Sequence, residues 1–150
     1  MIIISPFSRI LPNGKPNPKN YTYWKELVAL IDQPIIQVGV DGEEQLVPNF
    51  KKNLSIPELS TLIGECNTWI SIDSFFQHLC WDLGKPGIVL WGQSDPLIFG
   101  HPENINLLKS RDYLRKEQFW LWEQAEYRTD CFVEPLEVLK HLKNTKWSKV

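Results

Sequence analysis

Apolar residues in this chain gather in short runs that contain few polar residues, with mixed polar and apolar stretches between them. The runs cover residues 2–4, 35–40, 68–72 and 87–91. Runs without polar alternation are typical of strands buried on both faces, as in parallel sheets. A shorter run at 105–108 is expected to form an edge strand.

Helical periodicity appears between several of these runs. Two local features support the assignment. Ser55 followed three residues later by Glu58 is a capping box, which marks a helix start, and Gly84 is the usual residue after a helix end. Helices are therefore expected over residues 21–31, 55–65, 74–83 and 135–142.

Four other stretches have weaker patterns. Proline and glycine make residues 9–20 a loop, and residues 93–102 are also expected to be loop. Residues 43–53 are expected to form a short irregular or helical piece. Residues 110–128 have loose helical spacing and are expected to be a helix, with aromatic side chains in the core or an interface.

Strands that alternate with helices predict an α/β fold. The expected architecture is a three-layer α/β/α Rossmann-like domain with a mainly parallel sheet. The sequence has no internal repeat and no boundary between domains, so residues 1–150 are expected to form a single domain. A chain of this length can bury a substantial core.

Composition and charge narrow the function classes. The chain has 43% hydrophobic and 23% charged residues, as expected for a globular protein, and its net charge is −2. No broad cationic surface is available for a phosphate backbone, so nucleic acid is excluded as a general partner. The basic cluster at 140–149 is explained by a solvated helix end.

Cysteine, histidine and terminal patterns indicate the compartment. The three cysteines are far apart and odd in number, as in proteins with reduced thiols. The three histidines lack metal-ligand spacing with them, so no metal is expected. No stretch is long enough to span a membrane and the start does not resemble a signal peptide, which predicts a cytoplasmic protein.

Asp73 and Ser74 are the most informative polar residues. They follow the apolar run 68–72 and precede a helix, and the free N–H groups of a helix start favour anions. His78 lies one turn later, on the same side as Ser74. The simpler alternative is that Asp73 only caps the helix and that His78 bonds a backbone carbonyl.

Other candidates lie in the loops after the first two strands. Glu43 or Glu44 is expected to accept hydrogen bonds from ribose hydroxyls, as acidic residues do in dinucleotide folds, unless both are solvated turn residues. Lys19, Lys15 and Arg9 are basic candidates on the loop over residues 9–20, and the simpler alternative for each is an exposed, solvated side chain.

Together these elements resemble the C-terminal domain of GT-B glycosyltransferases, most closely the family of the ADP-heptose:lipopolysaccharide heptosyltransferases. The likeness covers nearly the whole chain and depends on the order of several short motifs. These are Ser5-Pro6-Phe7-Ser8, the acidic pair Glu43-Glu44, Asp73-Ser74-x-x-x-His78, Gly84-Lys85-Pro86, Trp91-Gly92-Gln93-Ser94-Asp95-Pro96 and Cys131-Phe132.

The resemblance implies a site for a nucleotide-sugar donor that works without a metal ion or other cofactor. The residues implied to contact the donor are Ser8, Lys19, Glu43 or Glu44, Asp73, Ser74, Phe75 and His78. In such enzymes the other domain supplies the acceptor site and usually the catalytic base. The chain resembles half an enzyme, so a partner chain or a second copy is expected to supply these parts.

One residue departs from the family pattern. The family usually has glycine after Asp-Ser, where the backbone approaches the diphosphate closely, and this chain has Phe75. Its ring is expected either to turn into the core or to change how phosphate is held.

Three hypotheses about function follow. The chain is a glycosyltransferase domain, a non-enzymatic module that sequesters or senses a nucleotide or phosphosugar, or an assembly scaffold with a vestigial pocket.

Overall fold

A computed structural model describes residues 1–144 of the protein. Its strands form a six-stranded sheet in the order β3-β2-β1-β4-β5-β6, and every neighbouring pair is parallel. The strands are β1 (Ile2–Ser5), β2 (Ile35–Gly39), β3 (Phe50–Lys52), β4 (Thr68–Ile72), β5 (Ile88–Trp91) and β6 (Ile105–Leu108). This order is that of the Rossmann fold.

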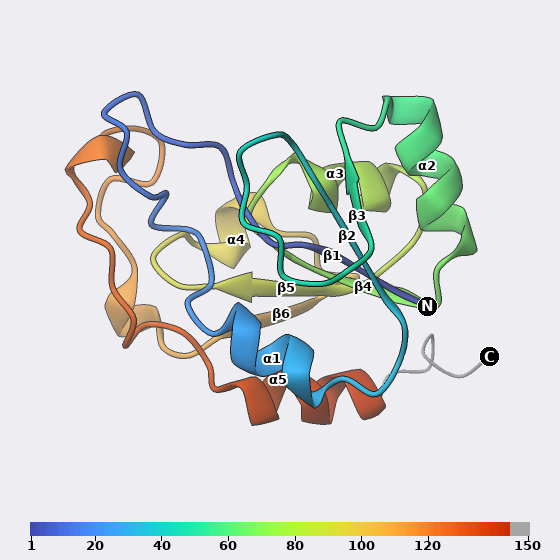
Figure 1. The fold of residues 1–150 in the computed structure, drawn as a ribbon. Helices are drawn as coiled ribbons and strands as arrows, with labels where there is room; N and C mark the ends of the chain where they lie inside the picture. Colours follow the sequence, from blue (N-terminus) through green and yellow to red (C-terminus); the bar gives the residue numbers. More distant parts are fainter. Residues whose placement is uncertain (145–150) are drawn as a thin grey trace.

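Helices cover both faces of the sheet, which confirms the predicted α/β/α architecture (Figure 1). Helices α1 (Trp24–Leu30) and α5 (Pro135–Lys143) pack side by side on one face. Helices α2 (Ile56–Glu65) and α3 (Phe75–Asp82) lie on the other. A short helix, α4 (Pro96–Phe99), follows β5.

The alternating side chains of the strands divide the core in two. Ile2 and Ile4 of β1 belong to the cluster under α1 and α5, whereas Ile3 belongs to the cluster under α2 and α3. In β4, Ile70 faces the first cluster and Trp69 the second. Because both faces of the central strands are buried, their sequences are mostly apolar on both faces, and Gln37, Thr68 and Ser71 are buried polar exceptions.

The local signals for helix ends are confirmed. Ser55 accepts a hydrogen bond from the Glu58 amide, and the Glu58 carboxylate accepts one from the Ser55 amide. Gly84 follows α3 with φ +70°, a conformation that glycine adopts without strain.

Several other expectations need correction. Residues 43–53 contain β3, residues 93–102 contain α4, and the first helix begins at Trp24 instead of residue 21. The prediction of a helix over residues 110–128 is wrong. That segment contains only two short 3₁₀ turns, Arg111–Tyr113 and Trp122–Gln124.

Polar contacts explain the shape of the 110–128 segment. The Arg115 amide donates to the Gln93 carbonyl, and the buried Gln118 side chain bonds both that carbonyl and the Asp95 amide. Leu121 adopts φ +64°, which interrupts any regular helix. These bonds attach the segment to the loop after β5, so tertiary contacts override its helical pattern.

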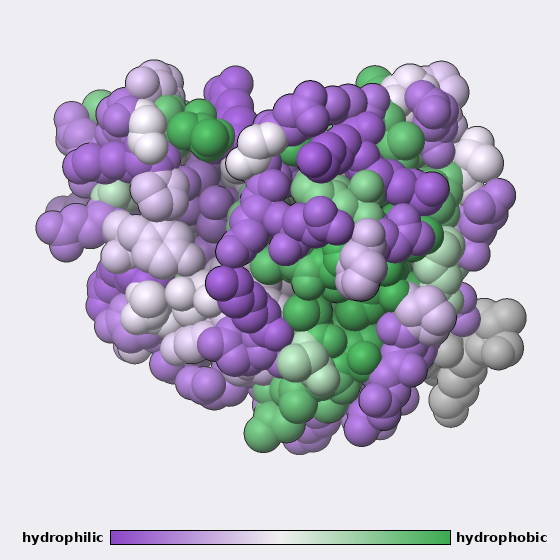
Figure 2. Space-filling model, viewed as in Figure 1, coloured by the Kyte–Doolittle hydropathy of each residue, from purple (hydrophilic) through white to green (hydrophobic). Residues whose placement is uncertain are grey.

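Surface and thiol features complete the description of residues 1–144. All three cysteines are buried and free, as expected. No helix in this range is long and apolar enough to cross a bilayer. In the view of Figure 2, hydrophobic side chains gather over α1 and α5, where Leu30 and Leu136 are exposed. Lys140, His141 and Lys143 of the basic cluster lie in the last turn of α5, and its residues 145–149 lie outside the described residues.

Gly87 provides a test of the second core cluster. A methyl group at Gly87 would overlap the ring of Trp69, which is fully buried and fixed by a hydrogen bond from its Nε1 to the Lys85 carbonyl. We expect Gly87→Ala to lower the free energy of unfolding by about 1–3 kcal/mol, measured by urea denaturation.

Gly64→Ala is the matched control, because a methyl group there meets nothing within 4 Å. Within helix α2 it should leave stability unchanged or raise it by up to about 1 kcal/mol. Equal stability of the Gly87 variant and the wild type would contradict the packing described here.

Candidate functional site

The topology creates a crevice where β1 and β4 lie side by side. The chain leaves β1 towards α1 on one face of the sheet and leaves β4 towards α3 on the other. The two loops therefore diverge at the carboxyl ends of adjacent strands. Open α/β sheets bind ligands at this position.

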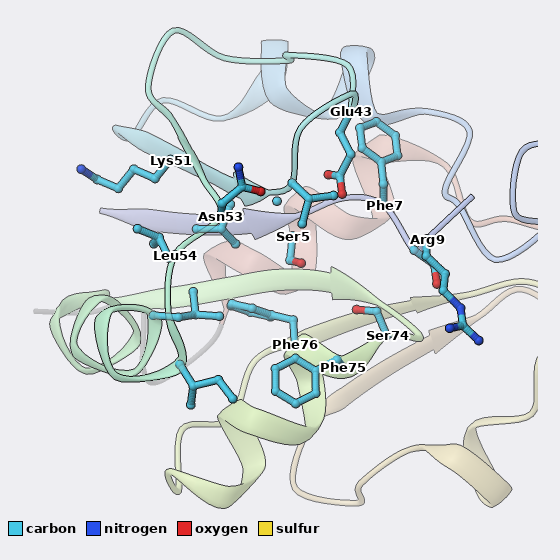
Figure 3. Close-up of a pocket in the computed structure, with 16 residues that line it drawn as sticks. Ser5, Phe7, Arg9, Glu43, Lys51, Asn53, Leu54, Ser74, Phe75 and Phe76 are labelled. Atoms are coloured by element: carbon cyan, nitrogen blue, oxygen red, sulfur yellow. The ribbon is translucent and has the colours of Figure 1, made fainter. Parts of the chain in front are cut away.

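A cavity of about 500 Å³ opens on the α3 side of this crevice (Figure 3). It lies between the segments that follow β1, β2 and β3 and the start of α3, and most of its lining is apolar. Its lining residues are Ser5, Phe7, Ser8, Arg9, Val38, Gly39, Val40, Glu43, Lys51, Asn53, Leu54, Ile56, Leu59, Ser74, Phe75 and Phe76.

Glu43 is the acidic residue in the lining of this cavity. Its Oε2 is buried without a hydrogen-bond partner, and burial raises the pKa of the carboxyl. In Figure 3 the carboxylate points down from the β2–β3 connection towards the cavity. The side chain folds back over Gly39, where any Cβ would overlap the carboxylate. A buried acceptor of this kind gains free energy from a ligand that donates a hydrogen bond.

Glu44, the alternative acid, lies elsewhere. Its carboxylate is 3.2 Å from the Lys25 ammonium and it lines a separate cavity next to α1. The structure therefore brings Glu43, and not Glu44, to the cavity of the crevice.

Lys19 and Asp73 meet across the crevice. Asp73 is only 5% exposed, and its Oδ2 lies 3.1 Å from Lys19 Nζ, close enough for an ion pair but without hydrogen-bond geometry. The ammonium also lies over the rings of Phe99 and Trp122, 5.7 and 5.0 Å from their centroids. Aromatic faces and a carboxylate thus hold Lys19 in place.

One further acceptor without a partner lies in the first turn of α3. Asp73 Oδ1 accepts a hydrogen bond from Gln77 Nε2, whereas Gln77 Oε1 is buried without a partner. The N-cap of α3 is Ser74, whose side chain makes no capping bond. The expectation that Asp73 is the cap residue is therefore wrong, and its carboxylate serves Lys19 and Gln77 instead.

The other predicted residues of the crevice divide into two groups. Ser8, Ser74 and Phe75 line the cavity, as does the competitor Arg9. Phe75 is 60% exposed, so its ring is not turned into the core. Lys15 is exposed and its amide bonds the Asn13 side chain, which places it outside the cavity lining.

His78 is not brought to the cavity. Its Nδ1 lies 2.8 Å from Nε2 of His101, and the Trp81 ring stacks on His101 at 4.7 Å between centroids. Burial, followed by the neighbouring His78, lowers the pKa of His101. The expected bond from His78 to a backbone carbonyl is replaced by this contact between imidazoles.

Sequence reasoning missed the residues that surround Lys19. Phe99 lies in α4, where a loop was expected, and Trp122 lies in the 110–128 segment, where a helix with its aromatic side chains in the core or an interface was expected. The 9–20 loop and this segment are tied by bonds from Asn13 to the Glu123 carbonyl and from Tyr127 to the Asn20 carbonyl. Figure 1 shows both at the carboxyl end of the sheet. No local sequence pattern signals such a contact.

Metal ligands do not cluster in the part of the chain that the structure describes. Within it, no group of three or more histidine, cysteine, aspartate or glutamate side chains is placed to hold a metal ion.

Comparison with known families agrees with this geometry. The model of glycosyltransferase family 9 (heptosyltransferase) matches residues 35–119, more than half of the chain. The chain belongs to glycosyltransferase family 9. The match includes β2 to β6, and with them Glu43 and the turn after β4.

A solved structure shows the same fold. The crystal structure of the family 9 glycosyl transferase from Veillonella parvula DSM 2008 matches with a TM-score of 0.67 and 16% sequence identity. The match covers 95% of this chain and 45% of that chain, so the present chain spans less than half of the other protein's length. No curated protein gives a significant match.

The Asp95–Arg111 pair gives a pH-dependent test of the loop that borders the crevice. The guanidinium donates to both carboxylate oxygens, at 3.1 and 2.8 Å, and holds the pKa of Asp95 below its usual value of 3.8. A lowered pKa in the folded state stabilises the fold above the unfolded-state pKa, and this stabilisation disappears as the pH falls through the folded-state value.

We therefore expect Arg111→Gln to reduce the free energy of unfolding at pH 6, with a deficit that shrinks as the pH falls below about 4. Urea denaturation over this pH range measures it. Lys116→Gln removes one positive charge from the same segment and should show no such pH-dependent deficit. A deficit that is constant with pH would contradict the ion pair.

Proposed function

We propose that this chain is the donor-binding domain of a family 9 glycosyltransferase and that the crevice between β1 and β4 holds a nucleotide sugar. The observation that carries the proposal is the cavity of about 500 Å³ with the unpartnered Glu43 Oε2, together with the Lys19–Asp73 pair at the same crevice. The cavity suits the nucleoside, and the region of the Lys19–Asp73 pair suits the diphosphate and the sugar.

The nucleoside half is supported by the cavity lining. Its walls are mostly apolar, as in sites that enclose a base. Glu43 supplies an acceptor for ribose hydroxyls at the end of β2, where acidic residues of Rossmann folds serve the same purpose. Ser8 and Ser74 add hydroxyl groups to the lining of the cavity.

The diphosphate half is supported by the cations of the 9–20 loop. Lys19 is held at the crevice, and Arg9 lines the cavity. Positive charge near the leaving diphosphate would stabilise the negative charge that develops as the glycosidic bond breaks, without a metal ion. Gln77 Oε1, which has no hydrogen-bond partner, and the Asp73 carboxylate beside Lys19 are acceptors suited to sugar hydroxyls.

Transfer would require an acceptor site and a general base supplied by protein outside this domain. The proposed setting is the cytoplasm, where sugar nucleotides are available.

Thermal denaturation with ADP, UDP, GDP and CMP sugars tests binding directly, because a ligand specific for the folded state raises the melting temperature. If none of these sugar nucleotides raises the melting temperature, the proposal is wrong.

Substitution of Lys19 distinguishes a specific contact with the diphosphate from long-range charge attraction. We expect Lys19→Met to weaken binding of the preferred nucleoside diphosphate by about tenfold or more, because it removes a charge-assisted contact. Isothermal titration calorimetry at low salt measures the change.

Lys15→Met is the matched control, since it removes the same charge from the same loop. Its affinity should stay near that of the wild type. Equal losses in the two variants would indicate a long-range charge effect and contradict a placed lysine. Circular dichroism melts establish that each variant is folded at the titration temperature.

Glu43 predicts a pH dependence of binding. The carboxylate accepts ribose hydroxyls best when ionised, and burial raises its pKa above the usual 4.5. Affinity should therefore fall as the pH is lowered through that raised pKa. Glu43→Gln should bind about tenfold more weakly at neutral pH and lose this part of the pH dependence. Glu44→Gln, whose carboxylate contacts Lys25, should retain it.

A further inference from the structure

Phe75 is exposed in an unusual place. It is the first residue of α3 and lines the cavity, yet 60% of its surface is open to solvent. Its neighbour Phe76 also lines the cavity but is only 4% exposed, because it packs edge-on against Trp69 at 5.5 Å between ring centroids. Packing in the core therefore accounts for Phe76 and leaves the ring of Phe75 without an equivalent partner.

The surroundings of Phe75 favour a flat, largely apolar ligand group. Leu59 and Ile56 of the α2 side and Val40 of the β2 side line the same cavity, and Val40 and Ile56 are themselves more than half exposed. In Figure 3 Phe75 and Phe76 approach from α3, and the Glu43 carboxylate approaches from the opposite wall. An aromatic face on one wall and one unpaired carboxylate on the other match a heterocycle attached to a hydroxylated sugar.

We infer that Phe75 is the base-stacking residue of this site. The inference rests on the proposed function, since it assigns one wall of the same donor cavity. An aromatic ring offers dispersion and π contacts to every base, and offers nothing to a phosphate. The phosphates are then held by Lys19 and Arg9, away from the ring.

If Phe75 stacks on the base, its contribution to affinity can be measured separately from that of the phosphates. Stacking of a base on an aromatic side chain contributes between about fivefold and a hundredfold in affinity when measured by alanine substitution. The contribution of Phe75 should appear with ligands that contain a base and be absent with inorganic pyrophosphate. Truncation should also be tolerated by the fold, because most of the side chain is already exposed.

The experiment titrates the full chain with ADP, GDP, CDP, UDP and pyrophosphate by calorimetry. Phe75→Ala and Phe75→Leu should weaken the tightest nucleoside diphosphate about tenfold. Phe75→Tyr, which keeps the aromatic face, should stay within about twofold of wild type. Pyrophosphate affinity should be the same in all variants. Trp120→Ala is the control, since Trp120 is also 60% exposed but does not line the cavity.

The outcomes separate this inference from the proposed function. If the wild type binds nucleoside diphosphates and Phe75→Ala binds them equally well, stacking is disproved while donor binding stands. If Phe75→Ala loses pyrophosphate affinity to the same extent, Phe75 acts on the phosphate site and the inference is again disproved. If the wild type binds none of the four nucleotides, both proposals fail together.

Discussion

A carboxylate buried at the end of a central strand needs a cation, because an isolated charge loses its hydration and is strongly disfavoured. Asp73 is in this position, and Lys19 provides the charge from a loop more than fifty residues earlier in the chain. The lysine is in turn held by rings of Phe99 and Trp122. One electrostatic requirement thus draws together the loops that follow β1, β4, β5 and β6.

The fold was largely predictable because its main signals are local. Apolar runs marked the buried strands, and the Ser55–Glu58 capping box and Gly84 marked helix ends. Strand β3 was not predicted, because it has only three residues and two of them, Lys51 and Lys52, are exposed, so it contains no apolar run. The 110–128 segment was wrongly predicted as a helix since its shape depends on Gln93 and Gln118, which are far from each other in sequence.

The candidate site was predictable only in part. The sequence indicated Asp73 and Ser74 from their place between strand and helix, but it left Glu43 and Glu44 equivalent. They differ because the turn at Asp41–Gly42, with φ +90° at the glycine, directs Glu43 back over Gly39. The partners of Lys19 and the exposure of Phe75 depend on packing between distant segments, and the pattern of one strand or helix carries no information about it.

The shortness of β3 has a consequence for how copies of this protein associate. An exposed sheet edge is a template on which another chain adds a strand, and brief, lysine-bearing edge strands oppose this growth. Lys51 and Lys52 place two positive charges on three residues of that margin. Edge-to-edge polymerisation through β3 is therefore disfavoured, and self-assembly would have to proceed through another part of the molecule.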